Sequence, residues 1–227
     1  MLPYGIDCFY HLARKNIVDF ERVYKIRKKN MFKEEYIASP TRASSLPYWK
    51  TITLSKIKKI KIVDRIEDNS LNKYYFKLVH YLKNCERPKL SEGFEFIKAS
   101  TEEYAKHINF CYENIHTTKD QLDEYKNHFV YDDNLWIAIK DKRSGKIVGS
   151  AIAELDSSIK EGVLEWVQVS KEYRNMGIGT ILVKELLYRM SDKAMFVCVC
   201  GDMNNPANPL ALYEKCGFTD KVIWCIE

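Results

Sequence analysis

The most informative segment of this 227-residue sequence reads Val169-Ser170-Lys171-Glu172-Tyr173-Arg174-Asn175-Met176-Gly177-Ile178-Gly179-Thr180. A predicted strand ends at its first residue, a polar loop follows, and a predicted amphipathic helix runs from the glycines to about Met190. Glycines let backbone N–H groups approach a ligand without an intervening Cβ. The first turn of a helix leaves N–H groups unpaired and carries a partial positive charge. The segment is therefore typical of a pyrophosphate cradle, or of a strand-to-helix turn whose glycines only make it tight.

Two other phosphate-binding motifs do not fit this segment. The spacing is Gly-x-Gly-x-x-Leu, and Leu182 stands where the dinucleotide-binding fingerprint needs a third small residue. The chain also lacks a Gly-Lys-Ser or Gly-Lys-Thr sequence, so it contains no P-loop.

A second segment with a well-defined local structure reads Asn204-Asn205-Pro206-Ala207-Asn208-Pro209-Leu210-Ala211-Leu212-Tyr213-Glu214-Lys215-Cys216-Gly217-Phe218. Asn208 is a suitable N-cap, and Pro209 suits the first position of a helix. Gly217 suits the left-handed residue that follows a helix. Tyr213 therefore lies in a short helix with two defined ends, where a tyrosine on its own would be a packing residue.

Together the two segments resemble the signature motifs of the GNAT superfamily of acyl-CoA-dependent N-acyltransferases. Arg174-Asn175-Met176-Gly177-Ile178-Gly179 resembles the family's Gln/Arg-x-x-Gly-x-Gly/Ala signature. About 30 residues later, Leu212-Tyr213-Glu214-Lys215-Cys216-Gly217-Phe218 resembles its closing Leu-Tyr-x-x-x-Gly-Phe motif. The resemblance covers roughly residues 94–226 and includes the order of strands and helices.

The sequence departs from the family pattern just before Tyr213. The family usually has an Asn seven residues and an Ala four residues before this tyrosine, and here Pro206 and Pro209 hold those places. Asn205 and Asn208 flank the prolines. Which asparagine meets the pantetheine arm of the donor therefore stays open.

The fold implied is α/β (α+β), with a mixed, mostly antiparallel GNAT-type sheet flanked by helices. The pattern after residue 91 alternates accordingly. Strands are expected at 94–98, 135–139, 147–155, 163–169, 194–200 and 222–226, and helical segments at 101–129, 177–190 and 209–215, with a turn at 143–146.

The polar segment 84–93 predicts a boundary between a mainly helical, basic region 1–90 and an acetyltransferase domain 91–227. Asp19 is expected to cap a helix to about Ala38, and Ser70 another that carries Leu71, Tyr74, Tyr75, Leu78 and Leu82. Residues 52–66 fit either a strand or a helix. We expect residues 1–90 to pack against the acetyltransferase part and to wall its acceptor pocket.

The resemblance implies acetyl-CoA as co-substrate and an amine as acceptor. The strand 165–169 would separate from the strand 194–200, so that backbone groups of Val167 and Val169 pair with the pantetheine amides. The amides of residues 174–180 would hold the pyrophosphate. The donor-binding residues so implied are Val167, Gln168, Val169, Arg174, Asn175, Met176, Gly177, Ile178, Gly179 and Thr180, together with Asn205 and Asn208.

Two residues are candidates for proton transfer. An amine with a pKa of about 10.4 costs about 4–5 kcal/mol to deprotonate near pH 7, which calls for a general base. Glu165 is the candidate base, directly or through water, with Glu154 in reserve; the alternative for Glu165 is a carboxylate that faces solvent. By the family pattern Tyr213 protonates or hydrogen-bonds the leaving thiolate, which is uphill by only about 2 kcal/mol.

Composition limits the other classes of protein. The N-terminus lacks the pattern of a secretory signal, no window reaches about 18 apolar residues, and seven scattered cysteines fit reduced thiols in the cytoplasm. No His-Glu-x-x-His, Cys-x-x-Cys or Gly-x-Ser-x-Gly pattern is present, so we expect no metal and no serine nucleophile.

The net charge of +5 is distributed unevenly. Residues 1–90 hold 20 Lys and Arg against 9 Asp and Glu, a net of +11, whereas the remainder has a net of −6. This indicates a solvated lysine-rich surface or a face for a polyanion, such as a cofactor phosphate or a nucleic acid. No nucleic-acid motif and no membrane segment support those partners, and a homodimer stays open. The alternative to an enzyme is a catalytically idle acyl-CoA sensor.

Overall fold

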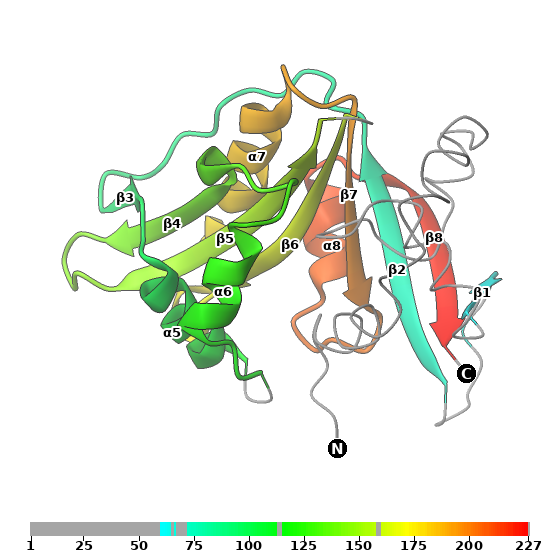
Figure 1. The fold of residues 1–227 in the computed structure, drawn as a ribbon, viewed down its shortest axis with the longest axis horizontal. Helices are drawn as coiled ribbons and strands as arrows, with labels where there is room; N and C mark the ends of the chain where they lie inside the picture. The colour runs from blue at the N-terminus through cyan, green and yellow to red at the C-terminus, as the bar shows by residue number, and fades with distance from the viewer. Residues whose placement is uncertain (1–59, 65, 67–71, 113–114, 158–159, 227) are drawn as a thin grey trace.

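The computed structural model describes residues 60–64, 66, 72–112, 115–157 and 160–226, and these form a sheet with helices on both faces (Figure 1). The elements are β1 (Ile60–Val63), β2 (Lys73–His80), β3 (Phe94–Ile97), α5 (Thr101–Cys111), α6 (Lys119–Tyr125), η2 (Asp133–Leu135), β4 (Trp136–Asp141), β5 (Ile147–Asp156), β6 (Glu161–Val169), η3 (Lys171–Tyr173), α7 (Ile178–Met190), β7 (Phe196–Asp202), α8 (Pro209–Lys215) and β8 (Thr219–Ile226).

The eight strands lie in the order β1-β8-β2-β7-β6-β5-β4-β3. All neighbouring strands are antiparallel except β6 and β7, which are parallel. β7 and β8 also run in the same direction, because each is antiparallel to β2 between them. The predicted mixed, mostly antiparallel sheet is confirmed.

Period-two alternation along the strands divides the core between the two faces of the sheet. On β4, Ile137 and Ile139 belong to the cluster that includes Leu182 and Leu186 of α7. Trp136 and Ala138 point the other way, into the cluster formed with α5 and α6. Figure 1 shows α5 and α6 in front of the sheet and α7 behind it. β6 and β7 are the two central strands of the sheet, and helices lie on both of its faces (Figure 1).

The helix predicted from Ser70 is wrong, because Lys73–His80 is strand β2. β2 pairs with β7 on one edge and with β8 on the other. The consecutive residues Leu78 and Val79 are both buried, so both faces of the strand are covered there and its apolar residues do not alternate cleanly. Tyr74 and Leu78 are four residues apart, which suits a helix, and they also share one face of a strand. Hydrogen bonds from β7 and β8, both distant in the sequence, favour the strand over the helix.

The remaining predictions for residues 1–90 are tested only in part. The helix predicted at Asp19–Ala38 lies outside the described residues. Of the ambiguous segment 52–66, Ile60–Val63 forms β1 at the edge of the sheet. The division of the chain near residue 91 stays a prediction, but β1 and β2 belong to the same sheet as the strands that follow.

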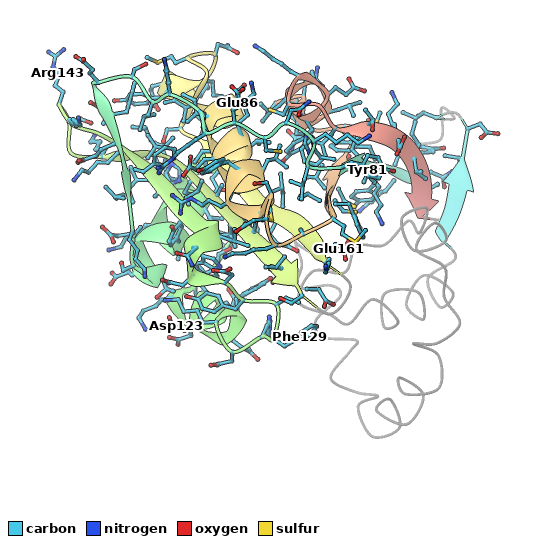
Figure 2. The ribbon with its side chains drawn as sticks, turned by 90° about the horizontal axis from the view of Figure 1, so that it is seen from above. Tyr81, Glu86, Asp123, Phe129, Arg143 and Glu161 are labelled. Atoms are coloured by element: carbon cyan, nitrogen blue, oxygen red, sulfur yellow. The ribbon has the colours of Figure 1, made fainter. Side chains whose placement is uncertain are left out.

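The segment between β2 and β3 crosses the outer side of α7. Figure 2 shows it running from Tyr81 past Glu86 toward the hairpin that carries Arg143. Leu82, Cys85 and Leu90 pack against the core along this path. The segment thus covers apolar surface of α7 although it contains no helix or strand.

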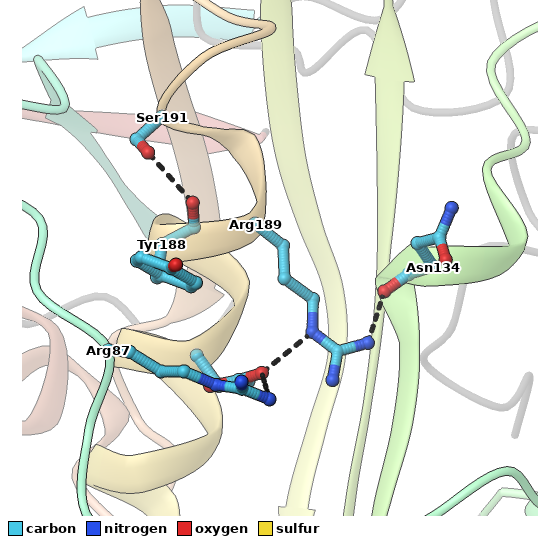
Figure 3. A network of polar contacts seen from close by, with 6 residues as sticks. Arg87, Asn134, Tyr188, Arg189 and Ser191 are labelled. Carbon is cyan, nitrogen blue, oxygen red and sulfur yellow. Dashed lines mark hydrogen bonds and ion pairs between the residues drawn. The ribbon is translucent and has the colours of Figure 1, made fainter.

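An ion-pair network fastens this segment to α7 (Figure 3). The buried carboxylate of Glu185 accepts from Arg189 Nε at 2.8 Å and from Arg87 Nε at 3.4 Å. Arg189 also donates from Nη1 to the Asn134 carbonyl at 2.7 Å, and so reaches η2. Two guanidinium groups compensate for the burial of one carboxylate, which would otherwise cost several kcal/mol.

Candidate active site

The centre of the sheet opens between β6 and β7. The two strands share a ladder from Glu161↔Phe196 to Leu164↔Val199, and β6 then continues five residues farther, to Val169. The separation of these strands, expected from the resemblance, is present. The second half of β6 thus has a paired edge toward β5 and an open edge toward β7.

A β-bulge at Glu165 marks the point where the two strands separate. Ile152 and Ala153 are consecutive on β5, yet their partners on β6 are Trp166 and Leu164. Glu165 is therefore the extra residue on β6, and a bulge of this kind bends its strand and increases the local twist. The carboxyl-bearing residue predicted as the general base lies at the inner end of the opening.

The backbone of Val167 and Val169 faces the open edge. Ser170 N–H donates to the Val148 carbonyl at 2.9 Å, so backbone groups of Ser170 and Gln168 point toward β5. Those of Val167 and Val169 then point the other way. Gln168 also has a buried side chain, which donates from Nε2 to Ser150 Oγ. Two of the three predicted strand residues thus present backbone groups to the opening, and Gln168 does not.

Both carbonyls on the open edge accept hydrogen bonds from side chains. Tyr112 donates from its hydroxyl to the Val167 carbonyl at 3.4 Å. Arg174 donates from Nε to the Val169 carbonyl at 3.3 Å. These contacts agree with the direction that the β5–β6 ladder assigns to the two carbonyls.

The loop after β6 leads into the N-terminus of α7. Asn175 (φ 63°) and Gly177 (φ 83°) are both left-handed, and Gly177 is the N-cap without a side chain. Ile181 N–H donates to Gly177 O at 3.0 Å, so the N–H groups of residues 178–180 come before this first helical bond. The first turn contains no acidic residue. This arrangement attracts an anion.

Three residues of the predicted cradle differ in how they take part. A Cβ at Gly177 would have nothing within 4 Å, whereas one at Gly179 would lie 3.3 Å from Leu212 on α8. Gly179 therefore permits close packing of α7 and α8. Ile178 has its side chain in the core against Gly149, so it can offer a ligand only its backbone.

The short helix α8 has the ends that the sequence predicts. Asn208 (φ 46°) is its N-cap and accepts from Ala211 N–H at 3.4 Å, Pro209 is its first residue, and Gly217 follows in a left-handed conformation (φ 91°). Tyr213 is only 6% exposed. Its ring packs between Phe76 of β2 and Phe218, with centroids 6.2 and 5.6 Å away.

A buried polar network between α5 and the sheet was not predicted from the sequence. His107 on α5 contacts Ser150 Oγ through Nδ1 at 2.8 Å and Ser170 Oγ through Nε2 at 3.1 Å. Gln168 Nε2 donates to the same Ser150 oxygen. Burial lowers the pKa of His107 to about 4, so the ring is neutral near pH 7 and can join one donor to one acceptor. A histidine among apolar residues on the inner face of a predicted helix was the available signal.

Two negative findings apply only to the residues that the structure describes. Among them, no group of three or more His, Cys, Asp or Glu side chains could hold a metal ion. No helix in this part of the chain is long and apolar enough to cross a membrane.

Comparison with known proteins places this geometry in a family. The model of the acetyltransferase (GNAT) family matches residues 101–218, which is more than half of the chain. A search of curated proteins found no match.

Solved structures share the fold at low sequence identity. A GCN5-related N-acetyltransferase from Sphaerobacter thermophilus is 16% identical with a TM-score of 0.57, covering 78% of this chain and 55% of that one. A Drosophila protein is 14% identical with a TM-score of 0.53, covering 79% and 57%. This chain thus spans little more than half the length of either structure. The family match together with the shared fold leads to one conclusion: the chain belongs to the acetyltransferase (GNAT) family.

Proposed function

We propose that this protein is an N-acetyltransferase that moves an acetyl group from acetyl-CoA directly to a primary amine in a ternary complex. The observation that carries the proposal is the open edge of β6, which leads from the Glu165 bulge to the uncapped N-terminus of α7. A donor with an extended diamide arm and a pyrophosphate matches these two features in order. The acceptor is a small molecule or a protein.

The pyrophosphate of the donor binds at the loop of residues 174–180. The N–H groups at the start of α7 and the left-handed turn at Asn175 and Gly177 point partial positive charge at one place. Arg174 adds a full positive charge close by. The exposed side chain of Met176 and the hydroxyl of Thr180 lie on the same loop and helix start.

The pantetheine arm pairs with Val167 and Val169 as if it were an added strand. In the loop between β7 and α8, Asn205 Oδ1 already accepts from Ala207 N–H at 2.9 Å, and Asn208 Oδ1 caps α8. Either asparagine therefore meets a carbonyl of the arm through its side-chain NH₂ group.

Acetyl transfer needs two proton movements. The neutral amine attacks the thioester carbonyl carbon, the new C–N bond forms, and the nitrogen proton passes to Glu165, directly or through water. The C–S bond then breaks, and Tyr213 gives its proton to the thiolate or hydrogen-bonds it. Glu165 lies at the bulge where β6 leaves β7, and Tyr213 lies on α8, which follows β7. The two residues thus come from different elements, with the ring of Tyr213 packed between Phe76 and Phe218.

A thiol-release assay with acetyl-CoA and a panel of amines tests the function. We expect turnover with at least one class of amine, and loss of about 100-fold or more for Glu165→Gln near pH 7. The loss should shrink as the pH rises, because an amine that is already neutral needs no base. Glu95→Gln, on the edge strand β3, is the matched control and should leave the rate unchanged.

The same assay separates the enzyme from a sensor. Acetyl-CoA binding by calorimetry without thiol release for any amine would favour a catalytically idle acyl-CoA-binding module. Absence of binding would overturn the donor site itself.

A further inference from the structure

The open half of β6 is a strand edge inside a sheet, and unpaired edges are usually covered. Here two side chains perform this task, since Tyr112 and Arg174 each donate to one exposed carbonyl. Arg174 belongs to the loop that leads to α7, whereas Tyr112 comes from the opposite layer of helices. Tyr112 is thus a contact to the proposed donor site that the sequence motifs do not include.

The position of Tyr112 is fixed by its own backbone and ring. It is the C-cap of α5, with an extended backbone and its N–H donating to the Ile108 carbonyl at 3.1 Å. Its ring packs against the edge of Trp166 on β6, with centroids 6.0 Å apart and planes at 67°. The hydroxyl therefore stays beside β6, next to the bulge.

The hydroxyl is a neutral donor under all ordinary conditions, because burial raises its pKa to about 12. Its hydrogen bond to the Val167 carbonyl is 3.4 Å long, well beyond the usual 2.7–2.8 Å for hydroxyl donors. A bond of this length covers the carbonyl but is weak, so a better donor displaces it. A pantetheine amide that adds to the edge of β6 is such a donor.

We propose that Tyr112 gates the donor site: its hydroxyl covers the Val167 carbonyl when the site is empty, and the pantetheine arm must displace it. This inference rests on the proposed function, and it assigns to Tyr112 an effect on the affinity for the donor. Because the hydroxyl and the arm compete for one oxygen, removal of the hydroxyl strengthens donor binding. A merely structural role of Tyr112 predicts no such gain.

Calorimetric titration of the full chain tests the gate with two probes. Coenzyme A carries the pantetheine arm, whereas adenosine 3′-phosphate 5′-diphosphate is its nucleotide part, with the pyrophosphate but without the arm. For Tyr112→Phe we expect coenzyme A to bind about two- to fivefold more tightly, as suits the loss of one weak competing hydrogen bond. Binding of the nucleotide without the arm should not change.

Tyr131→Phe is the matched control. Tyr131 also packs edge-to-face on a tryptophan, Trp136, at 5.6 Å, and its hydroxyl donates to Asp133 at 2.8 Å, away from β6. This variant should bind both probes as the parent does. If Tyr112→Phe does not fold, as judged by its thermal melt, Tyr112→Leu also lacks the hydroxyl and should show the same selective gain.

Three outcomes overturn the gate. Unchanged or weaker binding of coenzyme A by the folded variant would show that the hydroxyl does not compete. An equal gain for both probes would place the effect outside the pantetheine arm. If the parent binds neither probe, the proposed donor site fails and the gate falls with it, whereas parent binding without a gain in the variant overturns the gate alone.

Discussion

The two halves of β6 have the same neighbour on one side and different surroundings on the other. Glu161–Leu164 pair with β5 and β7, while Trp166–Val169 pair with β5 and have an open edge. Glu165, the bulged residue, separates the halves. One strand thus serves as the middle of a closed sheet along its first half and as a proposed binding edge along its second. The comparison shows that a single extra residue can end a ladder without ending a strand.

The two halves are also stabilised by different parts of the chain. The closed half relies on β7, which in turn pairs with β2 from the N-terminal side. The open half relies on side chains: Tyr112 and Arg174 on its carbonyls, and His107 below it. Removal of the strands that support the closed half should therefore abolish the fold. Substitutions around the open half should instead affect binding, catalysis or local stability.

Deletion of residues 1–83 should have the largest effect. It removes β2 from between β7 and β8, which exposes two strand edges and the core that contains Phe76 and Leu78. We expect the fragment 84–227 to lack a cooperative thermal transition, measured by circular dichroism. A fragment that melts cooperatively near the parent would show that β7 and β8 close without β2.

Gly177→Glu should affect only the open half. It places a side chain and a negative charge at the start of α7, where the proposed pyrophosphate binds, and we expect acetyl-CoA affinity to fall at least roughly 100-fold by calorimetry. Gly145→Glu is the matched control, because Gly145 is also left-handed (φ 68°) with nothing within 4 Å of a Cβ. Both variants carry similar backbone strain, so equal affinity in the two would remove the site from this loop.

Tyr213→Phe tests the proposed protonation of the leaving thiolate. We expect kcat to fall roughly 10- to 1000-fold, the range for loss of an acid catalyst. Acetyl-CoA affinity should change little, since one hydroxyl contributes only about 1 kcal/mol. The phenyl ring keeps the contacts with Phe76 and Phe218, so stability serves as the control. An unchanged kcat at saturating substrate would make Tyr213 a packing residue.

His107 should give the smallest effect, and it is one of pH dependence. Its pKa is about 4 in the folded chain against 6.5 for a free histidine, so the unfolded chain binds the proton more readily between these values. Stability present above pH 6.5 is then lost as the pH falls toward 4, by about 2 kcal/mol from pH 7.5 to pH 5.

Urea unfolding at the two pH values measures this loss. His107→Asn should show a loss smaller by that amount, and His116→Asn, at an exposed position, should behave as the parent. Equal pH dependence in all three proteins would mean that the network does not hold His107 neutral.

Local features were predictable because their causes are local. The caps of α8 at Asn208 and Gly217 follow from residues that favour left-handed or capping conformations wherever they occur. The junction of β6 and α7 likewise follows from a polar loop with Gly177 at the helix start. The resemblance of these two segments to family motifs then implied the sheet around them, and the family match agrees.

Features that depend on distant partners were not predictable in the same way. Lys73–His80 has apolar residues at both helical and strand spacing, and only β7 and β8, more than 115 residues farther along the chain, make it a strand. Tyr112 reads as an aromatic residue after a helix, and its contact with β6 exists only because α5 packs on that face.

By itself the sequence determined the conformations that a few residues impose on their own neighbours: the caps, the left-handed glycines, and the loop whose N–H groups can meet an anion. The tertiary structure decided which edges stay open and what covers them, including the place of β2 and the contacts of Tyr112 and His107. The physical reason is that φ and ψ preferences act within a few residues, whereas strand pairing and burial join groups across the whole chain.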